Sequence, residues 1–228
     1  MIASVHIAEI SRRAALGVLR KAPTAEKVPG LRYANTALAA PLSGSLLAAP
    51  QFGRAGLVAF WDDEASLDHF LAEHPTAQAL ADGWRVRLEP LRMHGSWPGV
   101  PDDLPRSRTV DHDGPAAVLT LGRLKFNRAL AFLRTSAKAE GAVVNAPGMR
   151  WATGLAKPPF VCTCSLWESD EAVRAYAYSD APPEHSNAIT TDRAKGFHKQ
   201  SAFIRFRPFG SEGKLDGRNP LSESWMAG

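Results

Sequence analysis

The chain has 228 residues, of which 45% are hydrophobic and 22% charged, with a formal net charge of +4; this composition is typical of a folded globular protein and excludes a disordered or fibrous chain. The basic residues are scattered, which argues against nucleic-acid binding, and no apolar stretch reaches the ~18 residues of a spanning helix, so we expect no integral membrane segment. Two cysteines are too few for a disulfide scaffold and the first residues lack a signal-peptide layout, so we expect a cytoplasmic setting.

Secondary-structure signals occur in the order strand, helix, strand, strand, helix, strand in each half of the chain. In the first half we expect a strand over Ala3–Ile10, a helix over Arg12–Lys21, a strand from Gly30 through Ala39, a strand ending at Trp61 followed by a helix, and a strand through Val86–Leu88. In the second half we expect the corresponding strand over Ala116–Leu124, a helix over Phe126–Glu140, a strand from Gly148 through Leu155, a strand ending at Trp167 followed by a helix, and a strand over Ala202–Phe206.

An internal repeat supports this division into halves. Pro29-Gly30-Leu31-Arg32-Tyr33-Ala34 is echoed by Pro147-Gly148-Met149-Arg150-Trp151-Ala152. Further on, each half has an apolar run that ends in Trp followed by an acid, first Trp61-Asp62 and later Trp167-Glu168. Acidic residues after the Trp suit the positive end of a helix dipole. A repeat of this length, present twice, indicates a duplicated supersecondary unit.

The element order βαββαβ is that of the ferredoxin-like unit. We therefore predict an α+β fold in which two duplicated units place their sheets face to face and close a barrel of the dimeric α/β type. The expected segments are 1–97 for the first unit, 98–115 for a Pro- and Gly-rich linker, 116–210 for the second unit, and 211–228 for a loosely attached tail. The alternative is that the repeat is a coincidence within an ordinary α+β domain.

Histidine and cysteine are the residue types in this chain that could bind a metal ion or a haem iron. His185 follows Pro182-Pro183 at an expected helix start, and from there an imidazole that faces an apolar cavity can coordinate iron. Packing or surface exposure is the alternative for His185. Cys162 and Cys164 share one face of a strand and read as small buried hydrophobic residues, although a thiolate can also bind haem iron. No zinc-hydrolase, serine-hydrolase or nucleotide-binding motif is present.

The second half resembles the spheroidene monooxygenase (acyclic carotenoid ketolase) family, which is placed in the dimeric α/β barrel superfamily and is regarded as haem-dependent. The first half matches more thinly. The matching features are Ser165-Leu166-Trp167, Ala175-Tyr176-Ala177-Tyr178, His185 with Ala188-Ile189, Gly196-Phe197 and Ile204-Arg205-Phe206, with Trp84 and Gly95-Ser96-Trp97-Pro98-Gly99 in the first half.

The resemblance implies a haem-dependent monooxygenase, an oxidoreductase that acts on an apolar small molecule of carotenoid type and forms a homodimer. It nominates His185 as the proximal iron ligand, Trp167 as a cofactor-binding residue, and Arg205 as a catalytic residue or a partner of a haem propionate. For Arg205 the alternative is a strand-face arginine in a surface ion pair. The functional alternatives are a cofactor-independent barrel monooxygenase, a small-molecule-binding stress protein without catalysis, and an interaction module whose barrel is filled with side chains.

Overall fold

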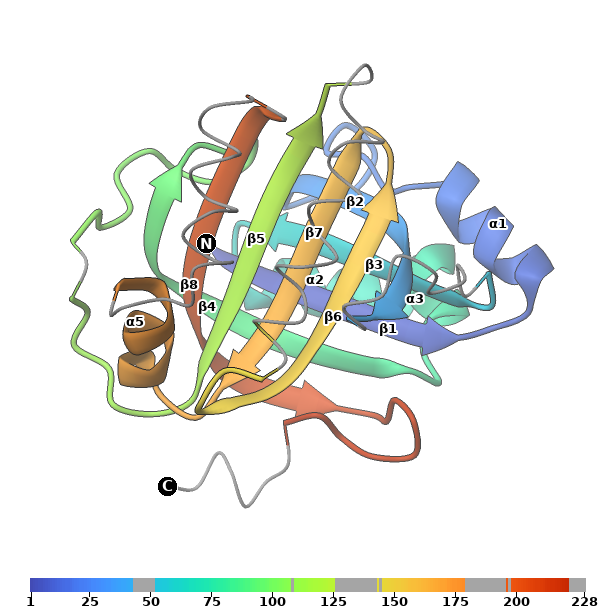
Figure 1. The fold of residues 1–228 in the computed structure, drawn as a ribbon. Helices are drawn as coiled ribbons and strands as arrows, with labels where there is room; N and C mark the ends of the chain where they lie inside the picture. The colour runs from blue at the N-terminus through green and yellow to red at the C-terminus, as the bar shows by residue number, and fades with distance from the viewer. Residues whose placement is uncertain are drawn as a thin grey trace.

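A computed structural model describes residues 1–42, 52–107, 109–125, 143, 145–178, 196 and 198–221. These residues form a closed barrel with the strand order β1-β3-β2-β6-β7-β5-β8-β4, and every neighbouring pair is antiparallel (Figure 1). The strands are β1 (Ile2–Glu9), β2 (Leu31–Pro41), β3 (Arg54–Trp61), β4 (Trp84–Gly95), β5 (Ala116–Leu124), β6 (Met149–Lys157), β7 (Phe160–Trp167) and β8 (His198–Glu212).

The two halves of the chain have the same strand order. The first half contributes β4-β1-β3-β2 to the barrel and the second contributes β8-β5-β7-β6, so the seams between them are the pairs β2–β6 and β4–β8. The mixed α+β class and the closed barrel predicted from the sequence are confirmed. The helix expected at 126–140 lies outside the described residues.

The described helices are short and lie between strands. None of them combines the length and the apolar character needed to cross a membrane. The helices are α1 (Arg12–Arg20), α2 (Glu64–Glu73), α3 (Pro75–Ala79) and α5 (Asp170–Tyr178).

The barrel interior is filled by apolar side chains from both halves. Alternate residues of each strand point inward, as the strand period of two requires, and they join in one buried cluster. Leu215 and Leu221 are 3% and 0% exposed and belong to the same cluster. The expectation of a loose tail from residue 211 is therefore wrong in the described part: β8 extends to Glu212, and burial of two leucines attaches the segment that follows.

The repeated Pro-Gly motif has a steric cause. Gly30 and Gly148 have φ angles of 70° and 76°, a left-handed conformation that favours glycine. A Cβ atom at Gly30 would stand 2.0 Å from the Oγ of Ser66, and one at Gly148 would stand 2.6 Å from the Cβ of Ala172. In both halves this turn packs against the helix that follows the Trp, so the motif serves the scaffold.

Helices α1, α2 and α3 cover the outer face of the first-half sheet and enclose a second core around Leu57, Trp61 and Phe70. His6 is 2% exposed in this layer; its Nε2 lies 2.9 Å from Ser4 Oγ and its ring meets Phe70 edge-on. Burial, reinforced by the charges of Arg85 and Arg87, lowers the pKa of His6 to about 3. His6 is therefore neutral in the folded protein.

This neutral histidine predicts a pH dependence of stability. Unfolding restores an ordinary pKa of about 6.5, so the unfolded chain binds one more proton than the folded chain between about pH 6.5 and pH 3. The free energy of unfolding should fall as the pH is lowered through this window, by about 3 kcal/mol by pH 4. In urea titrations His6→Leu should show a flatter pH dependence, whereas the exposed His69→Leu should keep the wild-type slope. Identical slopes for wild type and His6→Leu would contradict this.

Candidate functional site

The barrel interior does not offer a ligand site among the described residues of its wall. Cys162 and Cys164 point inward and are 4% and 0% exposed. Burial raises the pKa of Cys164 to about 12 and that of Cys162 well above its ordinary value. Both are neutral thiols packed in the core, as the sequence predicted, and neither is poised as a thiolate ligand.

The outer faces of the two halves differ at equivalent positions. In the first half one cross-strand row reads His6, Leu57 and Thr36 along β1, β3 and β2. The equivalent row of the second half reads Thr120, Thr163 and Gly154 along β5, β7 and β6.

At each of these three positions the second half has the smaller side chain: Thr in place of His, Thr in place of Leu, and Gly in place of Thr. The smaller side chains leave a more recessed surface, which we call the second outer face. Its outward residues are Val118, Thr120, Gly122, Ala152, Gly154, Ala156, Val161, Thr163, Ser165, Ser201, Phe203 and Arg205.

A histidine and an aromatic ring lie on the second outer face. A Cβ atom at Gly122 would stand 2.6 Å from Cδ2 and Nε2 of His198, so the imidazole lies directly against this glycine. Phe203 is 45% exposed and neighbours Thr120 across the strands. The face therefore combines apolar surface, hydroxyl groups and one imidazole, which suits a flat apolar ligand.

Of the three site residues predicted from the sequence, the structure describes Trp167 and Arg205 but not His185. His185 lies outside the described residues, so its assignment as an iron ligand stays a prediction. Trp167 ends β7 with 2% exposure, donates from Nε1 to Ser165 Oγ at 2.9 Å, and packs against Tyr176 with ring centroids 5.2 Å apart. Trp61, at the same place in the first half, is also buried and donates to a serine, but to Ser4 Oγ on the neighbouring strand β1. Burial against Tyr176 gives Trp167 a packing role, and its contact with a cofactor stays a prediction.

Arg205 points outward from β8 and forms a buried ion pair. Its Nη1 lies 2.6 Å from Oδ1 of Asp170, and the two side chains are 6% and 5% exposed. Arg87 holds the equivalent place in β4, where its guanidinium pairs with Glu64 at 2.9 Å. Glu64 and Asp170 each stand three residues after the Trp of their half, so both pairs tie the last strand of a half to its helix.

The ion pair gives Arg205 a role in the scaffold, because the equivalent arginine of the first half, Arg87, also ties a strand to a helix. The pair is buried here, not on the surface as the sequence-based alternative supposed. The assignment of Arg205 to a haem propionate or to catalysis stays a prediction.

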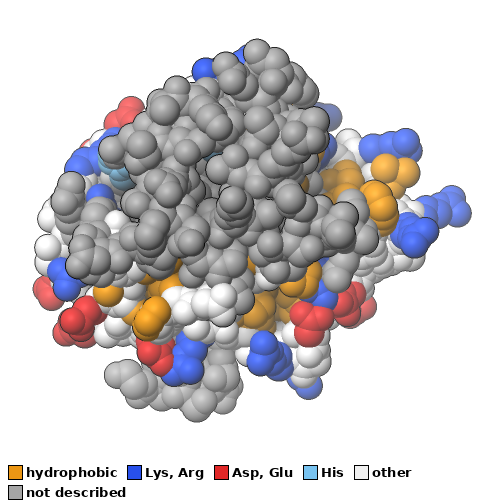
Figure 2. All heavy atoms as spheres, in the orientation of Figure 1, with side chains coloured by type: hydrophobic (Ala, Val, Ile, Leu, Met, Phe, Trp, Pro, Cys, Tyr) orange, Lys and Arg blue, Asp and Glu red, His pale blue; other side chains and the backbone are white. Residues whose placement is uncertain are grey.

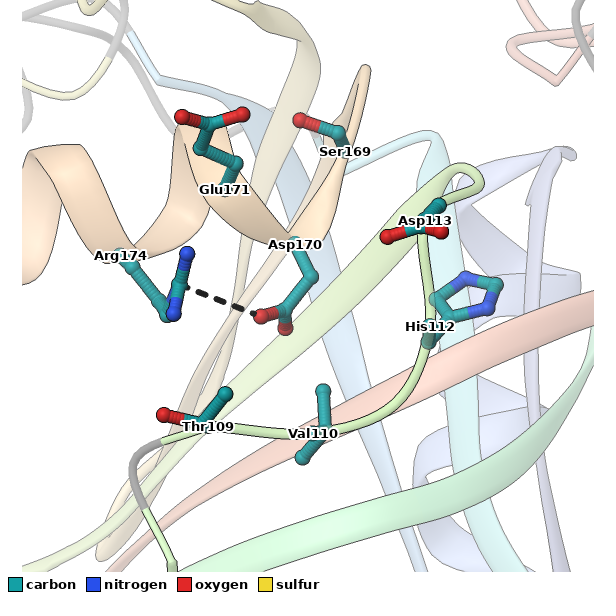
Figure 3. Close-up of a pocket in the computed structure, with 8 residues that line it drawn as sticks. All are labelled: Thr109, Val110, His112, Asp113, Ser169, Asp170, Glu171 and Arg174. Atoms are coloured by element: carbon teal, nitrogen blue, oxygen red, sulfur yellow. Dashed lines mark ion pairs between the residues drawn. The ribbon is translucent and has the colours of Figure 1, made fainter.

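A polar pocket of about 420 Å³ lies between the linker and the start of α5 (Figure 3). Asp170 and Arg174 face it from α5, with Arg174 Nε 3.7 Å from Asp170 Oδ2, while Asp113 and His112 face it from the linker. Asp170 is already neutralised by two arginines, and the lining is polar. This pocket does not suit an apolar ligand. Its remaining lining residues are Thr109, Val110, Ser169 and Glu171.

Sequence reasoning missed the most informative residues of the second outer face. His198 begins β8, and no spacing rule places its imidazole over Gly122, which is distant in the sequence. Thr120 and Thr163 look like ordinary strand residues. Comparing the two halves position by position would have found the Leu57-to-Thr163 and Thr36-to-Gly154 differences, because both lie at fixed offsets from the repeated motifs.

The amino-acid sequence is similar to those of two curated proteins. No protein-family model matches the chain. A Rubrivivax gelatinosus protein named spheroidene monooxygenase is 32% identical over 196 residues, which cover 83% of this chain and 73% of that protein. A Rhodobacter capsulatus protein of the same name is 29% identical over 173 residues, covering 73% of this chain and 71% of that protein.

Among solved structures, the crystal structure of aldoxime dehydratase matches with a TM-score of 0.56 and 12% identity, over 96% of this chain and 82% of that one. At this level of identity the likeness concerns the fold alone. It supports the barrel architecture described above.

The Arg205–Asp170 pair predicts a stability difference between two arginines of one strand. Arg205→Gln leaves a buried carboxylate without its nearest partner and should lower the free energy of unfolding by about 3 kcal/mol. Arg207→Gln removes an exposed pair with Glu89 and should cost less than about 1 kcal/mol. Urea denaturation measures both, and equal losses would contradict the structural role of Arg205.

Proposed function

Because the chain belongs to the spheroidene monooxygenase family, we propose that it is a haem-dependent monooxygenase that oxidises an apolar small molecule at the second outer face. The proposed location rests on one difference between the halves. Where the first half has His6, Leu57 and Thr36, the equivalent row of the second half has the smaller residues Thr120, Thr163 and Gly154. In the first half the bulky row is buried under helices. The smaller side chains of the second row leave room for a ligand against the sheet.

The described residues of this face fit a flat apolar ring system. Gly154 lets a ligand approach the backbone more closely than a larger residue would, since the nearest atom to a Cβ there would be Leu42 Cδ2 at 3.3 Å, whereas the imidazole of His198 occupies the space over Gly122. Phe203 offers an aromatic surface at the β8 side. His185 is the residue that we propose to hold the iron. Bound haem would supply the oxygen chemistry.

The chain's own residues orient the ligand and control the polarity around it. The hydroxyl groups of Thr120 and Thr163 are adjacent across β5 and β7 and can each donate one hydrogen bond. The imidazole of His198 lies beside Gly122 and can offer a ring nitrogen for a hydrogen bond. The Arg205–Asp170 pair keeps the start of α5 against the sheet. The substrate class, an apolar molecule of carotenoid type, rests on the names of the relatives.

We also propose that the chain is a duplication of one βαββαβ unit, over residues 1–97 and 116–210, with 98–115 as linker. The common strand order of the halves, the two left-handed glycines and the repeated Arg–acid pair support it. A homodimer is likewise a proposal. Since the barrel closes within one chain, a second copy is not required to complete it.

Haem binding predicts a spectrum. Protein purified with hemin should show a Soret band, and His185→Ala should shift or abolish it because the proximal ligand is lost. His69→Ala, on the exposed side of α2, is the matched control and should leave the band unchanged.

A wild-type protein that shows no Soret band after addition of hemin and removal of the unbound hemin would contradict the haem assignment. If apolar ligands then still raised the melting temperature, the cofactor-independent alternative would take its place.

The location of the site predicts a blocking variant. Thr163→Leu restores the side chain of the first half, Leu57, and fills the second outer face. Overfilling a close-packed site costs about 1–3 kcal/mol, so hemin should bind at least about tenfold more weakly while the barrel stays folded. Thr109→Leu in the polar pocket is the control and should bind hemin as the wild type does. Fluorescence-quenching titrations with hemin measure both affinities, and unchanged binding in Thr163→Leu would contradict the proposed face.

A further inference from the structure

The outward side of α1 carries basic and apolar side chains together. Residues 12–21 include four basic and no acidic residues. Ala15 and Val18 are buried against the sheet, whereas Leu16 is 44% exposed. We define the α1 patch as the surface formed by Arg12, Arg13, Leu16, Arg20, Lys21 and Phe52.

The charges at the start of α1 oppose its own dipole. Arg12 and Arg13 occupy the first turn, where no acid is present and where a positive charge costs a few tenths to about 1 kcal/mol. The chain follows the favourable pattern elsewhere, since α2 and α5 both begin with acidic residues. Among the described residues, no ion pair joins Arg12 or Arg13 to an acid. Helix stability therefore does not account for these two arginines.

A second exposed apolar side chain lies beside the same helix. Phe52 is 53% exposed, and the next residue, Gly53, accepts a 2.8 Å hydrogen bond at its carbonyl from the amide of Ile10, just before α1. Figure 2 shows hydrophobic and basic side chains gathered over α1, with no acidic side chains among them in this view. Exposed apolar groups surrounded by cations are typical of a surface that contacts a membrane interface.

We propose that the α1 patch docks the protein on an anionic bilayer surface, with Leu16 and Phe52 entering the headgroup region. Cations near such a surface each contribute attraction that falls off within a Debye length. The apolar side chains favour a bilayer over a nucleic acid, whose phosphates would be met by the arginines but would leave Leu16 and Phe52 without a function. The reason for docking, access to an apolar substrate dissolved in lipid, rests on the proposed function.

The patch adjoins the second outer face. Lys157 at the end of β6 donates from Nζ to the carbonyl of Leu19 at 2.6 Å, which joins this strand to the last turn of α1. The outward residues of β6, among them Gly154 and Ala156, belong to the second outer face. A bilayer in contact with α1 would therefore lie next to the face on which the apolar substrate is proposed to bind.

The experiment measures binding of the full chain to phosphatidylcholine vesicles with and without phosphatidylglycerol, by sedimentation, without hemin. The wild type should bind the anionic vesicles, and high salt should weaken the binding. Arg12→Gln combined with Arg13→Gln should weaken binding by roughly 20-fold, as expected for two basic residues at an anionic surface. Leu16→Ser should weaken it roughly fivefold through the lost apolar insertion.

The matched control is Lys199→Gln combined with Lys214→Gln, which removes the same charge from two exposed lysines elsewhere. It should bind the vesicles within about twofold of the wild type. Equal losses in the two double variants, or no preference for anionic vesicles, would overturn the proposal. Loss in the arginine variant with none in Leu16→Ser, together with equally tight binding of duplex DNA, would assign the patch to nucleic acid instead. Because hemin is absent, failure here leaves the haem test unaffected.

Discussion

Closure of the barrel is the constraint on which the rest of the structure depends. Each half has a sheet with two faces, and the inner faces of the two sheets pack against each other in one apolar core. Trp97 and Val100, which follow β4, and Leu215 and Leu221 from the last segment add to the same cluster. Among the described residues the barrel interior leaves no space for a ligand, so we expect a ligand site on an outer face or at a loop. The two outer faces are where the halves differ.

The outer face of the first-half sheet is buried in a second apolar core, which stabilises the fold. Three helices cover it, Trp61 and Phe70 fill the layer, and His6 is kept neutral within it. The second half keeps the framework of this arrangement: a buried tryptophan ends β7, and the arginine of the last strand pairs with an acid on the helix that precedes that strand. What it changes is the row between them, where smaller side chains replace larger ones. The two halves thus share scaffold contacts and differ at the row of side chains on which the proposed site depends.

Much of this framework could be predicted from the sequence because it depends on local signals. The ends of β3 and β7 at Trp61 and Trp167 follow from apolar runs that stop at an acid, and the turns at Gly30 and Gly148 follow from a backbone angle that only glycine adopts easily. The site was harder to predict. Arg205 looked functional on its own, and only its pairing with Asp170, together with the matching pair at Arg87, revealed its structural role.

The sequence by itself determined the element order, the duplication signal, the buried character of Cys162 and Cys164, and the family resemblance, since all of these are encoded in local patterns or in identities between chains. Only the tertiary structure decided which face each residue occupies. It placed His198 over Gly122, put Leu215 and Leu221 into the core, and brought Lys157 to the end of α1. These contacts join residues far apart in the chain, and their partners are chosen by strand register and barrel closure, which no local pattern records.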